Sequence, residues 1–295
     1  MFSEYFKNEI IKISSNITIY TENDKSVKNF GKQWRDYTNV QIDSRNKFTL
    51  SYNFLKKILH QDFSILENKE ILEIGCGAGR FTEHFAKFSK LCCSLDLSDA
   101  IFHNISKNKK NVKLAKANFL ELEPKKKFDI VFCRGVLQHT PNPKKSILKL
   151  HEFVKDNGLV IFDIYKKPKI GIFHPKYLIW RPLISNLIKY EEFEIFLHKN
   201  IDILLKIKRF IDRIFFQVKF FSDCIIPIWD YKNIYQLNDK QLSSLSILDT
   251  LDGIYAKYDL PMSNKEVLKI LKKNNIKIYK NDTYNNYFIT KIGLD

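Results

Sequence analysis

Three glycines at alternate positions follow a short apolar run in the segment ILEIGCGAGRF, residues 71–81. Gly75, Gly77 and Gly79 allow a tight backbone reversal after a strand, and they let a ligand approach the main chain because no Cβ stands in the way. A dinucleotide fingerprint reads GxGxxG, but Arg80 stands where that pattern needs its third glycine. The spacing therefore predicts a nucleoside-binding turn without a pyrophosphate cradle.

An acidic residue closes the next apolar run, LCCSL. Asp96 follows Gly75 by 21 residues, close to the interval of about 20 residues expected for a βαβ unit. A carboxylate at this position can accept hydrogen bonds from both hydroxyls of a ribose. The alternative is an Asp that only caps the following helix.

The elements that must position these residues alternate between strand and helix. The continuous apolar run FDIVFC, residues 128–133, is typical of a parallel strand buried on both faces. We expect further strands at 71–74, 91–96, 112–117 and 159–165, a helix at 144–154, and a closing antiparallel hairpin at 276–279 and 287–291. Ser263 and Glu266 predict a capping box that opens a helix running to about Lys273. Alternation over about a hundred residues predicts right-handed parallel crossovers, and thus a doubly wound α/β sheet.

Taken together, these motifs resemble a known family. Glu73, two residues before Gly75, completes an ExGxGxG pattern similar to motif I of the class I S-adenosylmethionine (AdoMet) methyltransferases. The loop RGVLQHTPNP at 134–143 is similar to the segment after strand four in their small-molecule branch, and LDTLDGIYAKYDLP at 248–261 extends the resemblance. It implies a seven-stranded, mostly parallel sheet with a closing antiparallel hairpin, AdoMet as cofactor, and methyl transfer.

The resemblance also assigns site residues. Asn118 stands where the family usually has an Asp that contacts the adenine amino group, and the Asn carbonyl can still accept that hydrogen bond. The cofactor-binding residues expected from the matching motifs are Glu73, Gly75, Cys76, Gly77, Gly79, Arg80, Asp96, Leu97, Asn118, Phe119, Arg134 and Gln138.

Candidate catalytic and acceptor-binding residues lie outside the glycine turn. His139 is a candidate general base for an alcohol acceptor, with Asp249 or Asp252 as alternatives. The other interpretation makes Gln138 and His139 loop scaffolding, and the two Asp residues surface caps. The residues expected to contact the acceptor are Trp34, in the FGKQWRD segment at 30–36, and Tyr231, Tyr255 and Tyr258. Trp34 is also large enough to pack an N-terminal helix onto the core.

Composition limits the function classes. The formal net charge is +16, but the lysines are dispersed, so we attribute most of the charge to solvated faces; a phosphate-bearing acceptor stays open and no specific nucleic-acid partner is expected. The five Cys contain no CxxC pair and the seven His no metal-binding spacing, which predicts a reducing compartment and no metal site. Neither a signal peptide nor a run of about 18 apolar residues is seen, so we expect a cytoplasmic protein.

The chain should fold as one core with elaborations. We expect an N-terminal helical extension at 1–60, an AdoMet-binding core at 61–167, an inserted helical lid at 168–250, and a return to the core at 251–295. A helix at 200–221 has a narrow polar stripe, which indicates either burial on several sides or peripheral contact with the inner membrane surface.

The expected function is AdoMet-dependent methyl transfer, most simply O-methylation, to a small molecule or a glycan precursor. One rival is a nucleic-acid (tRNA or rRNA) methyltransferase, although CRGVLQHTP stands after strand four in place of DPPY or NPPY, and no Pro-Cys nucleophile is present. The other rival is a non-catalytic binding protein, which the intact glycines, Glu73 and Asp96 disfavour.

Overall fold

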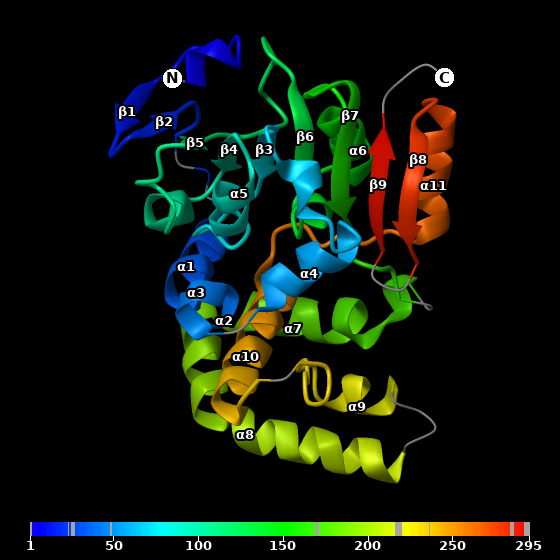
Figure 1. The fold of residues 1–295 in the computed structure, drawn as a ribbon. Helices are drawn as coiled ribbons and strands as arrows, with labels where there is room; N and C mark the ends of the chain where they lie inside the picture. The colour runs from blue at the N-terminus through cyan, green and yellow to red at the C-terminus, as the bar shows by residue number, and fades with distance from the viewer. Residues whose placement is uncertain are drawn as a thin grey trace. The chain divides into compact units, whose positions relative to one another are not determined.

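A nine-stranded sheet with the order β1-β2-β5-β4-β3-β6-β7-β9-β8 forms the centre of the fold (Figure 1). The computed structural model describes residues 2–22, 24, 27–47, 49–168, 171–215, 220–235, 237–283 and 286–291. The strands are β1 (Lys12–Ser14), β2 (Ile17–Ile19), β3 (Glu70–Ile74), β4 (Leu91–Asp96), β5 (Val112–Lys116), β6 (Phe128–Cys133), β7 (Val154–Asp163), β8 (Lys277–Asp282) and β9 (Tyr287–Lys291).

The middle of the sheet is parallel, as the alternation of strands and helices predicts. Strands β3 to β7 pair in parallel in the order β5-β4-β3-β6-β7, and β9 then adds antiparallel to β7. Their side chains are buried on both faces because helices cover both sides. The predicted doubly wound α/β class of the class I methyltransferases is therefore confirmed, although the strand number is nine rather than seven.

The two additional strands come from the N-terminal segment, which we expected to be helical. After a short 3₁₀ turn, η1 (Phe2–Glu4), strands β1 and β2 form an antiparallel hairpin, and β2 pairs in parallel with β5. Ile17 and Ile19 are buried in β2, whereas the side chains of β1 are exposed. The N-terminal segment contains the helices α1 to α4 after this hairpin, which the sequence analysis did not predict because the hairpin is stabilised by a distant strand rather than by local periodicity.

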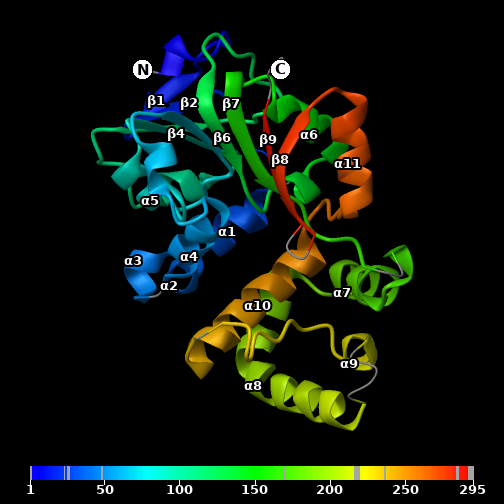
Figure 2. The same ribbon diagram turned by 45° about the vertical axis from the view of Figure 1, so that its right-hand side comes forward.

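Helices pack on both faces of the sheet (Figures 1 and 2). The first buried cluster contains side chains of the sheet, of α6 (Pro143–Leu150) and of α11 (Asn264–Lys273). The second contains those of α4 (Leu50–Ile58) and α5 (Thr82–Phe88). The remaining helices of this part are α1 (Lys28–Asp36), α2 (Thr38–Gln41), α3 (Asp43–Asn46), η3 (Phe63–Leu66), η4 (Asp99–His103) and η5 (Leu137–His139).

Residues Pro168–Lys257 form a separate compact unit, and the rest of the chain forms the unit that contains the sheet. The inserted unit consists of η6 (Gly171–Phe173), the π-helix η7 (Lys176–Trp180), α7 (Arg181–Leu187), α8 (Tyr190–Ile214), α9 (Phe220–Ile225) and α10 (Asp239–Tyr255). Helix α8 begins ten residues before the predicted start at Asn200, and residues 216–219 of the predicted helix, Gln217 among them, lie outside the described residues. No helix in the described ranges is both long and apolar enough to cross a membrane.

Removal of the Ser263 cap should destabilise the sheet-containing unit. The Ser263 hydroxyl accepts the Glu266 N–H at 3.2 Å, and the Glu266 carboxylate accepts the Ser263 N–H at 2.7 Å, which is the predicted capping box. We expect Ser263→Ala to lower the free energy of unfolding by about 1 kcal/mol in urea denaturation. Ser244→Ala, within α10, is the matched control, because its hydroxyl only donates to the carbonyl of Lys240 and caps no helix.

Candidate active site

The carboxyl ends of β3 and β6 meet where the strand order reverses, which is the ligand-binding position of open α/β sheets. Gly75 follows β3 with φ +77°, and Gly135 follows β6 with φ +71°. A Cβ on Gly75 would lie 2.1 Å from the Val136 side chain, so the two turns touch. A Cβ on Gly135 would meet nothing within 4 Å. There is thus open space beside the backbone at this point of the sheet.

Glu73 lies beneath the glycine turn and not on its surface. Its side chain is 2% exposed, and one carboxylate oxygen accepts hydrogen bonds from the hydroxyls of Thr82, at 2.6 Å, and Ser94, at 2.7 Å. Burial raises the pKa of Glu73 to about 7, against the lowering effect of these two hydrogen bonds. The structure therefore places Glu73 as the group that joins β3, β4 and the start of α5.

Asp96 ends β4 with its carboxylate at the glycine turn. One oxygen accepts the N–H of Gly77 at 2.7 Å, and the other accepts the N–H and hydroxyl of Ser98 at 2.8 and 2.6 Å. Burial raises the pKa of this carboxyl, although its hydrogen bonds oppose the shift. Its partners hold the carboxylate in one orientation, and the oxygen that accepts the Gly77 N–H keeps a second lone pair for a ligand.

Helix α1 covers the glycine turn through Trp34. A Cβ on Gly77, whose φ is +51°, would lie 2.7 Å from the Trp34 indole ring. One turn earlier in α1, a Cβ on Gly31 would lie 3.4 Å from the side chain of Ser98. The FGKQWRD segment thus packs on the loops after β3 and β4, and Trp34 is brought to the turn that the sequence analysis identifies.

Sequence reasoning missed Asp163, the last residue of β7. Its carboxylate accepts the N–H of Gly135 at 2.7 Å and forms an ion pair with Arg134, whose Nε lies 3.4 Å away. The Arg134 guanidinium also lies 3.8 Å from the centre of the Phe54 ring. Burial raises the pKa of Asp163. The sequence signal that could have found Asp163 is an acidic residue at the end of an apolar strand. The same signal identified Asp96.

Gln138 and His139 lie on η5 directly after this position. Gln138 is fully buried; its Oε1 accepts the N–H of Tyr165 at 3.4 Å, and its Nε2 has no hydrogen-bond partner among the described residues. His139 Nδ1 lies 2.9 Å from the carbonyl oxygen of Tyr258, and a carbonyl can only accept, so Nδ1 carries a proton. The ring centroid lies 4.9 Å from that of Phe30 and 5.4 Å from that of Tyr165.

The remaining predicted cofactor residues surround the turn. Asn118 forms a local turn after β5, because its Oδ1 accepts the N–H of Leu120 at 3.2 Å and its Nδ2 donates to Glu121 at 2.6 Å. Arg80 Nε donates to the Ser51 hydroxyl at 2.9 Å. Cys76 and Phe119 are buried, and Leu97 is half-buried. These contacts are structural, and cofactor contact stays a prediction for all five residues.

The predicted acceptor residues are divided between the two units. Tyr258 lies in the sheet-containing unit, where its carbonyl orients His139. The inserted unit contains Asp249, which accepts a hydrogen bond from the Tyr231 hydroxyl, and Asp252. Tyr255 donates its hydroxyl to the carbonyl of Ile188 at 2.9 Å, and burial raises its pKa to about 12. Tyr255 thus has a structural contact inside the inserted unit.

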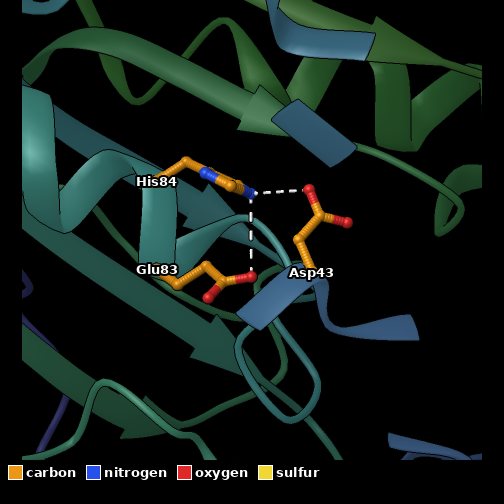
Figure 3. Close-up of side chains that lie close together, drawn as sticks. All are labelled: Asp43, Glu83 and His84. Atoms are coloured by element: carbon orange, nitrogen blue, oxygen red, sulfur yellow. Dashed lines mark hydrogen bonds and ion pairs between the residues drawn. The ribbon is translucent and has the colours of Figure 1, made fainter. Parts of the chain in front are cut away.

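A buried group of Asp43, Glu83 and His84 ties α3 to α5 (Figure 3). His84 Nε2 lies 3.2 Å from Asp43 Oδ2 and 3.7 Å from Glu83 Oε1. Asp43 also accepts the N–H groups of Ser51 and Tyr52, at 3.1 and 2.8 Å, in the first turn of α4. Both Asp43 oxygens are therefore engaged in holding α4, and the group fixes the helices that cover the glycine turn.

Comparison with known proteins agrees with this geometry. Residues 48–182 match a family described as a methyltransferase domain. A ubiquinone biosynthesis O-methyltransferase of Nitrosospira multiformis is 31% identical over 115 residues, which cover 37% of this chain and 48% of the relative. The ubiquinone biosynthesis O-methyltransferase of Rickettsia typhi is 27% identical over 203 residues, which cover 61% of this chain and 80% of the relative. The chain thus spans about half the length of the Nitrosospira relative.

Solved structures match this chain at low similarity. A magnesium protoporphyrin IX methyltransferase from Synechocystis PCC 6803, with bound S-adenosylhomocysteine, has a TM-score of 0.48 at 13% identity, covering 90% of this chain and 95% of the other. The sheet order and the family match support a class I AdoMet-dependent methyltransferase domain. The glycine turn, Asp96 and the loop after β6 belong to that domain.

Loss of the Asp96 charge should weaken AdoMet binding. A carboxylate that accepts hydrogen bonds from ligand hydroxyls contributes about 1.5 to 3 kcal/mol, so we expect Asp96→Asn to raise the dissociation constant about 10- to 100-fold in calorimetry. Asp99→Asn is the matched control, because the exposed Asp99 carboxylate lies three residues away and contacts Lys116 at 2.5 Å. Equal loss in both variants would contradict the role of Asp96.

A side chain at Gly77 should displace Trp34 from the turn. We expect Gly77→Ala to weaken AdoMet binding at least tenfold, because the new methyl group overlaps the indole and the positive φ disfavours Ala. Gly135→Ala places Ala at a similar positive φ but causes no overlap with a neighbouring side chain. Comparison of the two variants therefore separates the effect of backbone strain from that of overlap. Trp34→Ala combined with Gly77→Ala should recover part of the loss if overlap is the cause, as measured by calorimetry and thermal unfolding.

Proposed function

We propose that this chain transfers the methyl group of AdoMet to a hydroxyl oxygen of a small molecule or glycan precursor. The observation that supports this most directly is the Asp96 carboxylate, which accepts the Gly77 N–H at the glycine turn. The loop after β6 adds the buried amide of Gln138 and the imidazole of His139, which the Tyr258 carbonyl orients. Such a set combines nucleoside recognition with a base.

The residues present fit AdoMet as cofactor. Asp96 would accept hydrogen bonds from the ribose hydroxyls, and Asn118, through its side-chain carbonyl, would face the adenine. The turn from Gly75 to Gly79 would bring main-chain groups against the ligand without side chains between them. When bound, AdoMet supplies an activated methyl group on a sulfonium, so positioning and exclusion of water account for much of the rate.

His139 is the proposed general base. With a proton on Nδ1, which the Tyr258 carbonyl holds, the neutral ring has its lone pair on Nε2. In the reaction the acceptor oxygen forms a bond to the methyl carbon as the carbon–sulfur bond breaks, and the hydroxyl proton goes to Nε2. The Phe30 and Tyr165 rings fix the plane of the imidazole. Asp249 and Asp252 are the alternative bases.

A hydroxyl acceptor is favoured by the relatives. Those of Nitrosospira multiformis and Rickettsia typhi are named O-methyltransferases, and removal of a proton from an alcohol requires a base such as His139. The formal charge of +16 favours an acceptor that bears phosphate. Tyr231, Asp249, Trp34 and Tyr258 are the proposed contacts to acceptor hydroxyls.

Methyl transfer should depend on the imidazole of His139. An acceptor is first identified by methyl uptake from labelled AdoMet with nucleotide sugars, lipid-linked sugars and small alcohols. With that acceptor we expect His139→Gln to lower kcat about 10²- to 10⁴-fold, with little change in AdoMet affinity, because general-base catalysis contributes in this range. His103→Gln, an exposed His on η4, is the control. A loss below tenfold would remove His139 from the mechanism, and no AdoMet binding at high micromolar concentration would overturn the proposed function itself.

A further inference from the structure

Helix α8 presents a continuous apolar stripe to solvent. Phe196, Ile203, Ile207, Phe210 and Ile214 recur at steps of seven, four, three and four residues, so they lie along one side of the helix. Their exposed fractions are 47%, 59%, 44%, 61% and 54%. Large apolar side chains that are exposed singly need no explanation, but five in one line mark an interaction surface.

A basic stripe runs directly beside the apolar one. Lys199, Lys206 and Arg213 recur every seven residues, and all three are exposed. At 100° per residue they lie on one flank of the apolar stripe. An apolar face bordered by Lys and Arg is typical of helices that lie in the interface of a membrane, where the apolar side chains enter the acyl boundary and the cations meet lipid phosphates.

The opposite side of α8 is anchored inside the inserted unit. Leu197, Ile201 and Leu205 are buried on that side, and α8 packs against α9 and α10 (Figure 2). Lys208, 4% exposed, pairs with Asp223, and Arg209 forms a two-bonded ion pair with Asp230 at 2.6 and 2.8 Å. These contacts fix the rotation of the helix about its axis. The apolar stripe therefore stays on the side of α8 that faces away from α9 and α10.

We propose that this face of α8 docks on the surface of an anionic phospholipid bilayer, with the helix parallel to the membrane plane. The charge favours this occupant over a second copy of the chain, because two copies that each carry +16 repel, whereas anionic headgroups attract all three basic side chains. A helix of 25 residues is about 37 Å long, which allows all five apolar side chains to enter the interface together. The inference is independent of which acceptor is methylated.

Binding of the full chain to lipid vesicles tests the proposal. We expect co-sedimentation with vesicles of phosphatidylcholine and phosphatidylglycerol, little with phosphatidylcholine alone, and weaker binding at high salt. The pair Phe196→Ser and Phe210→Ser should weaken binding at least tenfold. Lys199→Gln, Lys206→Gln and Arg213→Gln together should weaken it about a hundredfold, at about fivefold per charge.

Matched variants in the other unit separate this face from general charge and hydrophobicity. Ile13→Ser removes an exposed apolar side chain from β1, and Lys90→Gln, Lys109→Gln and Lys110→Gln remove three exposed charges; both should leave binding unchanged. Equal losses in the control and α8 variants, or no preference for the anionic vesicles, would overturn the proposal. The proposal would also be overturned if the chain formed a dimer in analytical ultracentrifugation and the Phe variants abolished this dimer without changing vesicle binding. Thermal unfolding and AdoMet calorimetry on each variant show whether it is folded.

Discussion

The buried carboxyl of Glu73 is the interaction on which the site depends. Through Thr82 and Ser94 it joins the end of β3, the middle of β4 and the first residue of α5. The glycine turn lies between β3 and α5, and its three glycines have no side chains to hold its shape. Without a buried acceptor at Glu73 the two hydroxyls would lack a shared partner, and unsatisfied buried polar groups are costly.

Two further buried carboxylates hold the backbone of glycines at the site. Asp96 holds the backbone of Gly77, and Asp163 holds that of Gly135, so a carboxylate at the end of a strand supports a glycine on each side of the point where the strand order reverses. Burial raises the pKa of all three carboxyls. The site therefore concentrates acidic groups in a setting of low polarity, where each hydrogen bond is strong.

Much of this core follows from local pattern. Strand β6 has the predicted bounds because five of its six residues are apolar, and the box of Ser263 and Glu266 caps α11 as predicted because capping is decided within four residues. The hairpin of β1 and β2 could not be predicted, since β1 is exposed and β2 has three residues whose burial depends on β5. Asp43 and His84 are 41 positions apart in the sequence, so no local pattern predicts their contact.

The two segments that connect the core to the inserted unit lie side by side. Lys166 and Met262 form a parallel bridge, with the Met262 N–H donating to the carbonyl of Tyr165 at 3.0 Å and the Lys167 N–H to that of Met262 at 3.2 Å. For the core, residues 168–257 are thus a loop whose ends are already closed. Because the entropy of loop closure grows only with the logarithm of length, about 90 residues cost the core little more than a short turn would. The sheet-containing unit can therefore hold an insertion of this length without losing the closure of its own chain.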